Sequence, residues 1–271
     1  MAQPELNAVV AQRIEVAPGL IVLRVVPDGW ELQPFEPGQF AVLALPGSAP
    51  RYAMSDPEEV QRKPEVLIKR SYSIASSSVA TEYVEYYITL VRSGALTPRL
   101  FALQPGDRLW MSQKSSGLFT LDKVPADRHV ALIATGTGLA PYMSMLRTYL
   151  AGGTERRFAV LHGARHSWDL GYRSELSTLR RVCPNFTYLP IVSRPAEELV
   201  EWRGATGHVQ DLWDSGDLEA AWGFQPTAED THVFLCGNPA MIESMSTVLT
   251  AEGFREHSKK QPGEIHVERY W

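Results

Sequence analysis

The chain has 271 residues, 44% hydrophobic and 21% charged, which is typical of a folded protein and long enough for two domains. Its net charge of −5 argues against a broad nucleic-acid surface, and its two cysteines are too few for an iron–sulfur cluster or a structural zinc, which need about four ligands. It contains no apolar run of about 18 residues and no signal-peptide pattern at its start, so we expect a cytoplasmic protein without membrane contact.

Short strands separated by Gly- and Pro-containing turns dominate the first half of the chain. We predict strands at residues 9–16, 20–26, 40–45, 66–74, 83–91 and 109–112. One short helix is expected at residues 98–103, and a polar excursion with four prolines lies between Pro46 and Glu65. This pattern predicts a six-stranded antiparallel β-barrel over residues 1–122.

Strands alternate with helices in the second half of the chain. Apolar runs at residues 130–134, 158–162, 189–192 and 233–236 predict strands, and helices are expected at 141–150 and 174–181. The last helix has a cap at Asn238, Pro239 in its first turn and Gly253 at its end, with Met241, Met245, Val248 and Leu249 on one face. The alternation predicts an α/β parallel-sheet domain over residues 123–271.

A glycine turn joins the first of these strands to a helix. Because Gly136 and Gly138 lack Cβ atoms, a pyrophosphate can approach the backbone amides at the helix start. The third glycine of the usual fingerprint is absent, and a tight strand–helix turn also favours glycine for structural reasons alone.

Two arginines follow the next two predicted strands. Arg165 and Arg194 come directly after these strands, and a guanidinium binds phosphate through two parallel hydrogen bonds. After a phosphate-binding turn, the pair favours NADP over NAD as the nucleotide, although surface arginines are common at strand ends.

A polar strand end in the first half combines a cation, a ring and hydroxyl groups. In a regular strand, Arg70 and Tyr72 share one face, while Ser71 and Ser73 share the other. These groups can supply the phosphate cation, the stacking ring and the hydrogen-bond donor that a bound flavin dinucleotide needs. Polar strand ends are also ordinary, so the pattern is weak by itself.

Four blocks of sequence, taken together, resemble the bacterial ferredoxin/flavodoxin–NADP reductases. They are Arg70-Ser71-Tyr72-Ser73, Gly136-Thr137-Gly138, Cys236-Gly237-Asn238-Pro239 and the aromatic C-terminus Val267-Glu268-Arg269-Tyr270-Trp271. The blocks occur in the family's order. Residues 1–69 agree in strand pattern and in Pro37-Gly38-Gln39-Phe40.

The resemblance implies two cofactors, FAD and NADP, and a role for individual residues. Arg70 would contact the FAD pyrophosphate, Tyr72 would pack along the isoalloxazine, and Ser73 would bind near flavin N5. The remaining implied FAD residues are Ser71, Tyr87, Ile88, Thr89, Leu90, Ala95, Leu96 and Thr97, and stacking by Tyr270 and Trp271. The implied NADP residues are Gly136, Thr137, Gly138, Ala164, Arg165, Ser193, Arg194, Gly237, Asn238 and Met241. Ser73, Cys236 and Glu268 would be the catalytic residues. Without the resemblance, Cys236 reads as a small buried residue and Glu268 as a solvated one. Thr97 also has the chemistry of a helix N-cap.

The implied reaction is hydride transfer between NADP(H) and flavin N5, followed by single-electron transfer to a separate ferredoxin or flavodoxin. We expect a monomer, no resident metal, and a basic patch for the acidic carrier that includes Lys69, Lys114 and Arg92. Alternatives are an NAD(P)H-dependent flavin reductase and a non-enzymatic flavoprotein module or redox sensor. His208 stands where many relatives have a third phosphate-binding arginine, which predicts a weaker or pH-dependent NADP preference.

Overall fold

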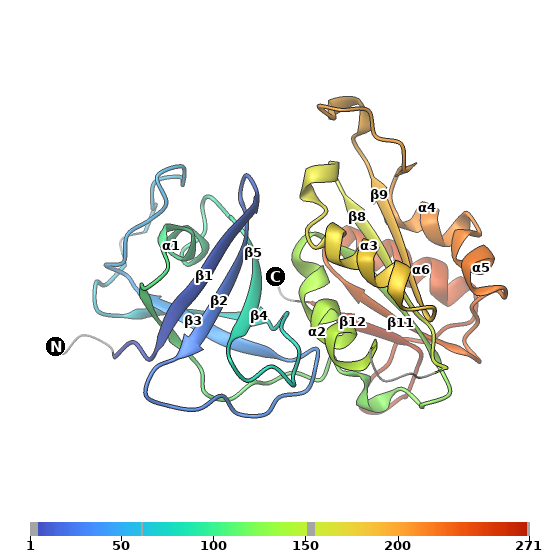
Figure 1. Cartoon of the computed structure of the whole chain (residues 1–271), viewed down its shortest axis with the longest axis horizontal. Coiled ribbons are helices and arrows are strands. Elements are labelled where there is room, and N and C mark those ends of the chain that lie inside the picture. The colour runs from blue at the N-terminus through green and yellow to red at the C-terminus, as the bar shows by residue number, and fades with distance from the viewer. Residues whose placement is uncertain (1–4, 61, 151–154, 270–271) are drawn as a thin grey trace. The chain divides into compact units, whose positions relative to one another are not determined.

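The computed structural model describes residues 5–60, 62–150 and 155–269, which form two compact units (Figure 1). The first unit comprises the described residues of 1–120 together with Met143–Thr148. The second comprises the described residues of Leu121–Tyr142 and Tyr149–Trp271. No helix within these described ranges is long and apolar enough to cross a membrane.

The first unit is built on a six-stranded antiparallel sheet with the order β4-β3-β6-β1-β2-β5. Its strands are β1 (Ala8–Ala17), β2 (Leu20–Pro27), β3 (Phe40–Pro46), β4 (Leu67–Ser73), β5 (Val84–Thr89) and β6 (Arg108–Met111). The two outer strands, β4 and β5, meet at an antiparallel bridge between Ile74 and Tyr86, which curls the sheet into a barrel. The predicted barrel is confirmed.

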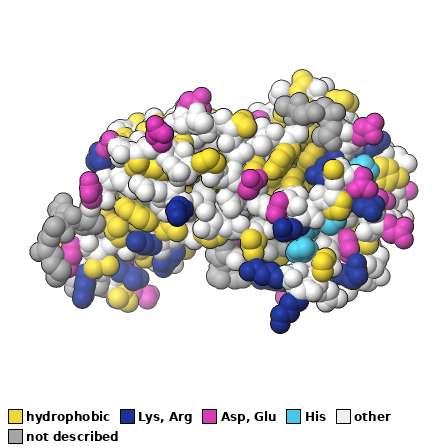
Figure 2. Space-filling model, turned by 90° about the horizontal axis from the view of Figure 1, so that it is seen from below, with side chains coloured by type: hydrophobic (Ala, Val, Ile, Leu, Met, Phe, Trp, Pro, Cys, Tyr) yellow, Lys and Arg dark blue, Asp and Glu magenta, His cyan; other side chains and the backbone are white. Residues whose placement is uncertain are grey.

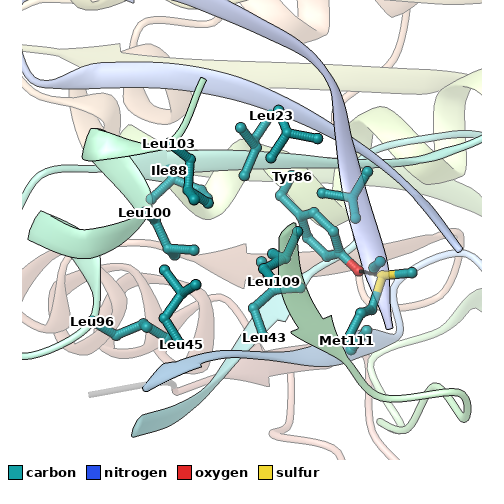
Figure 3. Packing of buried hydrophobic residues seen from close by; sticks show 14 of the residues in the cluster. Leu23, Leu43, Leu45, Tyr86, Ile88, Leu96, Leu100, Leu103, Leu109 and Met111 are labelled. Atoms are coloured by element: carbon teal, nitrogen blue, oxygen red, sulfur yellow. Dashed lines mark hydrogen bonds between the residues drawn. The ribbon is translucent and has the colours of Figure 1, made fainter. Parts of the chain in front are cut away.

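The barrel core fills with side chains that point inward from alternate strand positions (Figure 3). Leu23, Leu43 and Leu109 are fully buried, and Leu100 of α1 (Thr97–Ala102) closes the core from one side. Burying such a side chain stabilises the fold by about 1.5 to 3 kcal/mol. The Tyr86 hydroxyl, also buried, donates to Met111 Sδ at 3.0 Å.

The polar excursion between Pro46 and Glu65 is held against α1 by a buried arginine. Arg99, 2% exposed, donates from Nη1 and Nη2 to the two carboxylate oxygens of Glu58 at 2.8 and 2.9 Å. It also donates to the Ala95 and Gly47 carbonyls at 2.7 and 2.6 Å. One side chain therefore links the excursion to the turn that precedes α1.

The second unit is built on a parallel sheet with the order β10-β9-β8-β7-β11-β12. Its strands are β7 (His129–Thr135), β8 (Phe158–Ala164), β9 (Phe186–Val192), β10 (Ala205–Thr206), β11 (Thr231–Cys236) and β12 (Ile265–Glu268). Every pairing in this sheet is parallel. The predicted parallel-sheet domain is confirmed. In sheets of this type, ligands bind outside the carboxyl ends of the strands, beside the first strand where the order reverses.

Helices cover the parallel sheet on both faces (Figure 1). They are α3 (Arg173–Val182), α4 (Val209–Asp214), α5 (Asp217–Trp222) and α6 (Pro239–Ala251). The helix that follows β7, α2 (Ala140–Tyr149), is divided between the two units, with Met143–Thr148 in the first. The core beneath α4, α5 and α6 contains alternate sheet residues such as Ile133 and Leu235. On α6 the buried face is Met241, Ile242, Met245 and Leu249, so Ile242 takes the place predicted for Val248, which is half-buried.

Candidate functional site

The first group of candidate residues is at the end of β4. We use the name barrel site for residues 70–73 together with residues 87–90 and 95–97. Arg70 and Ser71 are exposed, and the Arg70 guanidinium donates to the Lys69 carbonyl at 2.7 Å. In the register with β3, Arg70 pairs with Leu43 and Tyr72 with Ala41. The two side chains lie on the same face of β4, as the alternation predicts.

Tyr72 forms the apolar part of the barrel site. Its ring packs edge-on against Tyr86, with 6.5 Å between ring centroids. Burial raises the pKa of the Tyr72 hydroxyl above its usual value, while nearby Arg70 lowers it. The phenol therefore stays neutral at physiological pH, and the barrel site presents a neutral ring beside an exposed cation.

Only some of the residues at 87–90 and 95–97 present a side chain to solvent. Tyr87, Ile88 and Leu96 are 3%, 1% and 2% exposed, and Ile88 and Leu96 belong to the barrel core. If Ile88 and Leu96 contact a cofactor, the contact must come from their backbone. Thr89 is exposed, and Leu90 and Ala95 are half-buried.

The turn before α1 is shaped by Thr97 and Gly94. Thr97 was expected to cap the helix, but it is the first helical residue, and the capping position is Leu96 without a side-chain bond. The Thr97 hydroxyl instead bonds both the N–H and the carbonyl of Val91 at 3.1 Å. A Cβ at position 94 would lie 2.9 Å from the Val91 carbonyl oxygen, so the turn requires glycine.

The second group of candidates lies at the carboxyl ends of the parallel strands, and we call residues 136–138, 164–165, 193–194 and 237–238 the sheet edge. Gly136, at the end of β7, has a φ of +56° and open space where a Cβ would point. A Cβ at Gly138, in contrast, would lie 2.2 Å from the Cys236 carbonyl oxygen. Gly138 is therefore required for packing, whereas Gly136 leaves an open backbone surface that suits a phosphate.

The end of β11 interlocks with the end of β7. The Asn238 N–H donates to the Thr135 hydroxyl at 2.8 Å, and Gly237 has a φ of +138°. The Asn238 side chain accepts from the Ala240 N–H at 2.9 Å, which confirms it as the cap of α6. Met241 is 6% exposed and packs in the core, so its side chain is directed away from solvent.

Cys236 and Glu268, two of the three predicted catalytic residues, are neighbours in the sheet. They pair in the register of β11 with β12, and Cys236 Sγ donates to Glu268 Oε2 at 3.5 Å. Cys236 is fully buried, whereas Glu268 is half-buried. Ser73, the third, belongs to the first unit and is half-buried at the end of β4.

The two predicted phosphate-binding arginines lie on adjacent strand ends. The Arg194 N–H donates to the Arg165 carbonyl at 2.9 Å, and the Ser193 N–H donates to the Ala164 carbonyl at 3.0 Å. Both guanidinium-bearing residues are exposed. Within residues 5–60, 62–150 and 155–269, the Arg165 side chain forms no ion pair or hydrogen bond, so its donors are available to a phosphate.

Other predicted residues have more limited structural support. His208 lies two residues after β10 and is the capping residue of α4, where its N–H donates to Asp211 Oδ2 at 2.7 Å. Tyr270 and Trp271 lie outside the described residues. Among the described residues, no group of three or more His, Cys, Asp or Glu side chains is arranged to hold a metal ion.

Two features of the site were missed in the sequence. The Arg99–Glu58 pair joins residues 41 positions apart, so no local pattern indicated it. Glu197, which lies 3.6 Å from Arg194, follows it by three residues, a spacing that brings side chains together in a single helical turn. That spacing was a usable signal.

This barrel and parallel sheet, with arginines on adjacent strand ends, define a two-domain oxidoreductase that binds a nicotinamide nucleotide. The pattern of the oxidoreductase NAD-binding domain family matches residues 132–247. Flavodoxin/ferredoxin–NADP reductase of Escherichia coli K12 is 32% identical over 88% of each chain. Ferredoxin–NADP reductase B of Sorangium cellulosum is 34% identical over 87% of this chain and 85% of its own. A crystal structure of a Neisseria gonorrhoeae ferredoxin NADP+ reductase, with bound FAD and NADP, aligns over 98% of both chains with a TM-score of 0.80 and 21% identity. The chain belongs to the flavodoxin/ferredoxin–NADP reductase family, which is a family of enzymes.

Proposed function

We propose that this enzyme transfers hydride between NADP(H) and bound FAD, and single electrons between FAD and a separate ferredoxin or flavodoxin. When bound, FAD supplies the conversion between two-electron and one-electron chemistry. The observation that carries the proposal is the pair Arg165 and Arg194 on adjacent strand ends, beside the open turn at Gly136, in a chain of this family.

The barrel site suits FAD. Arg70 offers an exposed cation for the pyrophosphate, and Tyr72 on the same strand face offers a neutral ring for the isoalloxazine. Ser73 follows with a hydroxyl that can donate a hydrogen bond to the flavin. Residues 95–97, at the start of α1, offer backbone amides to a phosphate.

The sheet edge suits NADP. The open backbone at Gly136 admits the pyrophosphate, and Arg165 and Arg194 bind the 2′-phosphate. Cys236 and Glu268 lie together at the ends of β11 and β12, where the half-buried Glu268 would face the nicotinamide half of the nucleotide and the buried Cys236 thiol would hold its carboxylate. In that position the Glu268 carboxylate holds a negative charge or a proton near the nicotinamide ring.

An acidic electron carrier fits the outward face of the barrel. Lys69 lies over the Trp110 ring, 4.4 Å from its centroid, and Lys114 is exposed on the segment that follows β6. On the face of the first unit that Figure 2 shows, several Lys and Arg side chains lie among apolar ones. Arg92, a third expected member, is already paired with Asp56 at 3.2 Å, so Lys69 and Lys114 are the stronger candidates. Electrostatic attraction of this kind accelerates association and weakens with salt.

The decisive experiment is an anaerobic absorbance titration of the purified protein with NADPH and, separately, with NADH. We expect FAD-like bands that bleach at much lower concentrations of NADPH than of NADH. Equal sensitivity to both nucleotides would contradict the roles of Arg165 and Arg194. Bands that do not bleach with either nucleotide would favour the non-enzymatic module. In a separate assay, an increase in the rate of NADPH oxidation on addition of free FMN would favour a flavin reductase.

Two finer points belong to the same proposal. The first is that the protein is a monomer, and the second is that it works in the cytoplasm. Both agree with the proposed transfer of electrons to a small diffusible carrier. Sedimentation of the holoenzyme at several concentrations tests the first point, since a mass near twice that of the chain would contradict it.

A further inference from the structure

Arg194 is already engaged by a carboxylate of its own loop. The turn of residues 195–197 (η5, Pro195–Glu197) closes with the Glu197 N–H donating to the Arg194 carbonyl at 3.1 Å. This turn places Glu197 Oε1 3.6 Å from Arg194 Nη1. The side chains of Arg194 and Glu197 are 50% and 56% exposed, so the carboxylate can be displaced by a ligand.

The other oxygen of the same carboxylate is held by His166, which follows Arg165 in the chain. Glu197 Oε2 lies 2.8 Å from His166 Nε2, while His166 Nδ1 lies 3.0 Å from Asp169. The hydrogen bond with Glu197, more than that with Asp169, raises the pKa of His166. The Glu197 carboxylate therefore lies between the two strand ends that carry Arg165 and Arg194.

The loop that carries Glu197 is fixed from a second point. Glu198 accepts from the Ser167 N–H at 2.5 Å and from the Ser167 hydroxyl at 2.7 Å. Because both glutamates bind the segment after β8, Glu197 is held near the arginines even though its side chain is exposed.

We propose that Glu197 competes with the 2′-phosphate of NADP for Arg194 and so limits how strongly this enzyme prefers NADP(H) over NAD(H). The inference rests on the proposed function, in which Arg165 and Arg194 bind that phosphate. A carboxylate and a phosphate are both acceptors for the same guanidinium donors, and two anions at this spacing repel each other. Binding of a 2′-phosphate must therefore displace Glu197 from Arg194 or tolerate its charge, whereas a nucleotide with a free 2′-hydroxyl meets neither cost.

The test compares the binding of 2′-phospho-AMP and of AMP to the FAD-loaded holoenzyme by calorimetry at low salt. The discrimination is the ratio of the AMP dissociation constant to that of 2′-phospho-AMP. Glu197→Gln removes the charge but keeps a side chain of the same shape. The matched control is Glu201→Gln, which removes a 79% exposed carboxylate from the same loop, where it lies 3.7 Å from Arg203.

We expect Glu197→Gln to raise the discrimination by roughly threefold to fivefold, which is the upper part of the range for an exposed ion pair. The gain should come from tighter binding of 2′-phospho-AMP and should shrink at high salt. Glu201→Gln should change the ratio by less than about twofold. A Glu197→Gln variant with the wild-type ratio, or with no larger gain than the control, would overturn the proposal.

Two further variants separate this inference from the proposed function. If Arg165→Gln and Arg194→Gln both lower the discrimination while Glu197→Gln leaves it unchanged, the phosphate site stands and only the competition is wrong. If neither arginine variant changes the ratio, the 2′-phosphate does not bind here, and both ideas are wrong.

Discussion

The barrel site and the sheet edge are assembled by different means. At the sheet edge, strand order is sufficient: parallel neighbours end at one edge, so residues 164–165, 193–194 and 237–238 come together wherever their strands pair. In the barrel, the turn before α1 also depends on Arg99, which a glutamate from a distant excursion holds in place. Backbone topology thus determines one group of residues, whereas a long-range side-chain contact supports the other.

The largest effect on stability is expected at Gly138, where the sheet edge has no room for a Cβ atom. In Gly138→Ala, the new Cβ would lie 2.2 Å from the Cys236 carbonyl oxygen and 2.7 Å from the Gly237 nitrogen, and both are backbone atoms. We expect a loss of about 3 kcal/mol or more in the free energy of unfolding, measured by urea denaturation. Gly136→Ala, with open space but a φ of +56°, should cost only about 1 kcal/mol. Equal losses in the two variants would contradict the packing role of Gly138.

The next effect tests the support of the barrel site. Arg99→Met keeps the apolar stem but leaves the Ala95 and Gly47 carbonyls without this donor and Glu58 without its main partner. We expect a loss of about 2 kcal/mol in stability, together with faster release of FAD on dilution, followed by flavin fluorescence. Arg62→Gln is the matched control, because Arg62 meets the same Glu58 only at 3.8 Å and is exposed. A stable Arg99→Met variant with unchanged FAD release would contradict a supporting role.

The same carboxylate gives this interaction a pH dependence. The hydrogen bond from Arg99 lowers the pKa of Glu58 below its usual value, against the opposing effect of burial. A carboxyl with a lowered folded pKa stabilises the protein above its unfolded pKa, and that stabilisation is lost as pH falls through the folded pKa. The stability difference between wild type and Arg99→Met should therefore narrow below about pH 4.5.

These contrasts explain how much of the molecule the sequence could predict. Both sheets, the α6 cap at Asn238 and the shared face of Arg70 and Tyr72 follow from local patterns, because hydrophobic alternation and helix-end chemistry act over a few residues. The expectation of a Thr97 cap was wrong because its hydroxyl bonds Val91 across the turn, a choice that only the folded loop makes available.

The candidate site was predictable to the same extent. The sequence indicated which residues end the parallel strands, but the catalytic and cofactor roles came from the family resemblance. It could not indicate that Ile88 is buried in the core, since β-strand alternation gives a face but not the side of the barrel that is filled. Nor could it indicate the burial of Leu96, because this residue lies in the turn before α1, where no periodic pattern applies. It also gave no indication of the Arg99–Glu58 contact.

A moderate effect is expected at His266, which lies in β12 two residues before Glu268. Burial, followed by repulsion from His232 and His257, lowers the pKa of His266 to about 3. Because the unfolded chain takes up this proton near pH 6.5 and the folded chain does not, stability is complete above pH 6.5 and falls as the pH drops toward 3. One such group costs about 1.4 kcal/mol between pH 7.5 and 5.5.

The measurement is the free energy of unfolding in urea at these two pH values. His266→Gln should reduce the loss between pH 7.5 and 5.5 by about 1 kcal/mol. Part of the dependence will remain, because burial also lowers the pKa of His162 to about 4. A variant with the full wild-type dependence would show that His266 is not protonated on unfolding in this range.

The smallest effect is expected at Asn238, a residue of the sheet edge, where a role in stability can be separated from a role in binding NADP. Asn238 caps α6 with its side-chain oxygen, and its backbone N–H donates to the Thr135 hydroxyl. These two bonds hold the side-chain amide at the sheet edge, beside the proposed nicotinamide site. Asn238→Ala should cost about 1 kcal/mol in stability through loss of the cap. Asn238→Ser keeps a capping oxygen and should stay within about 0.5 kcal/mol of wild type. If NADP affinity, measured by calorimetry, falls in both variants while stability falls only in the alanine variant, the amide acts on the ligand independently of the cap. If the serine variant is as unstable as the alanine variant, loss of the cap does not explain the loss of stability. The Asn238 side chain would then support the sheet edge in another way, and backbone topology alone would not determine this group of residues.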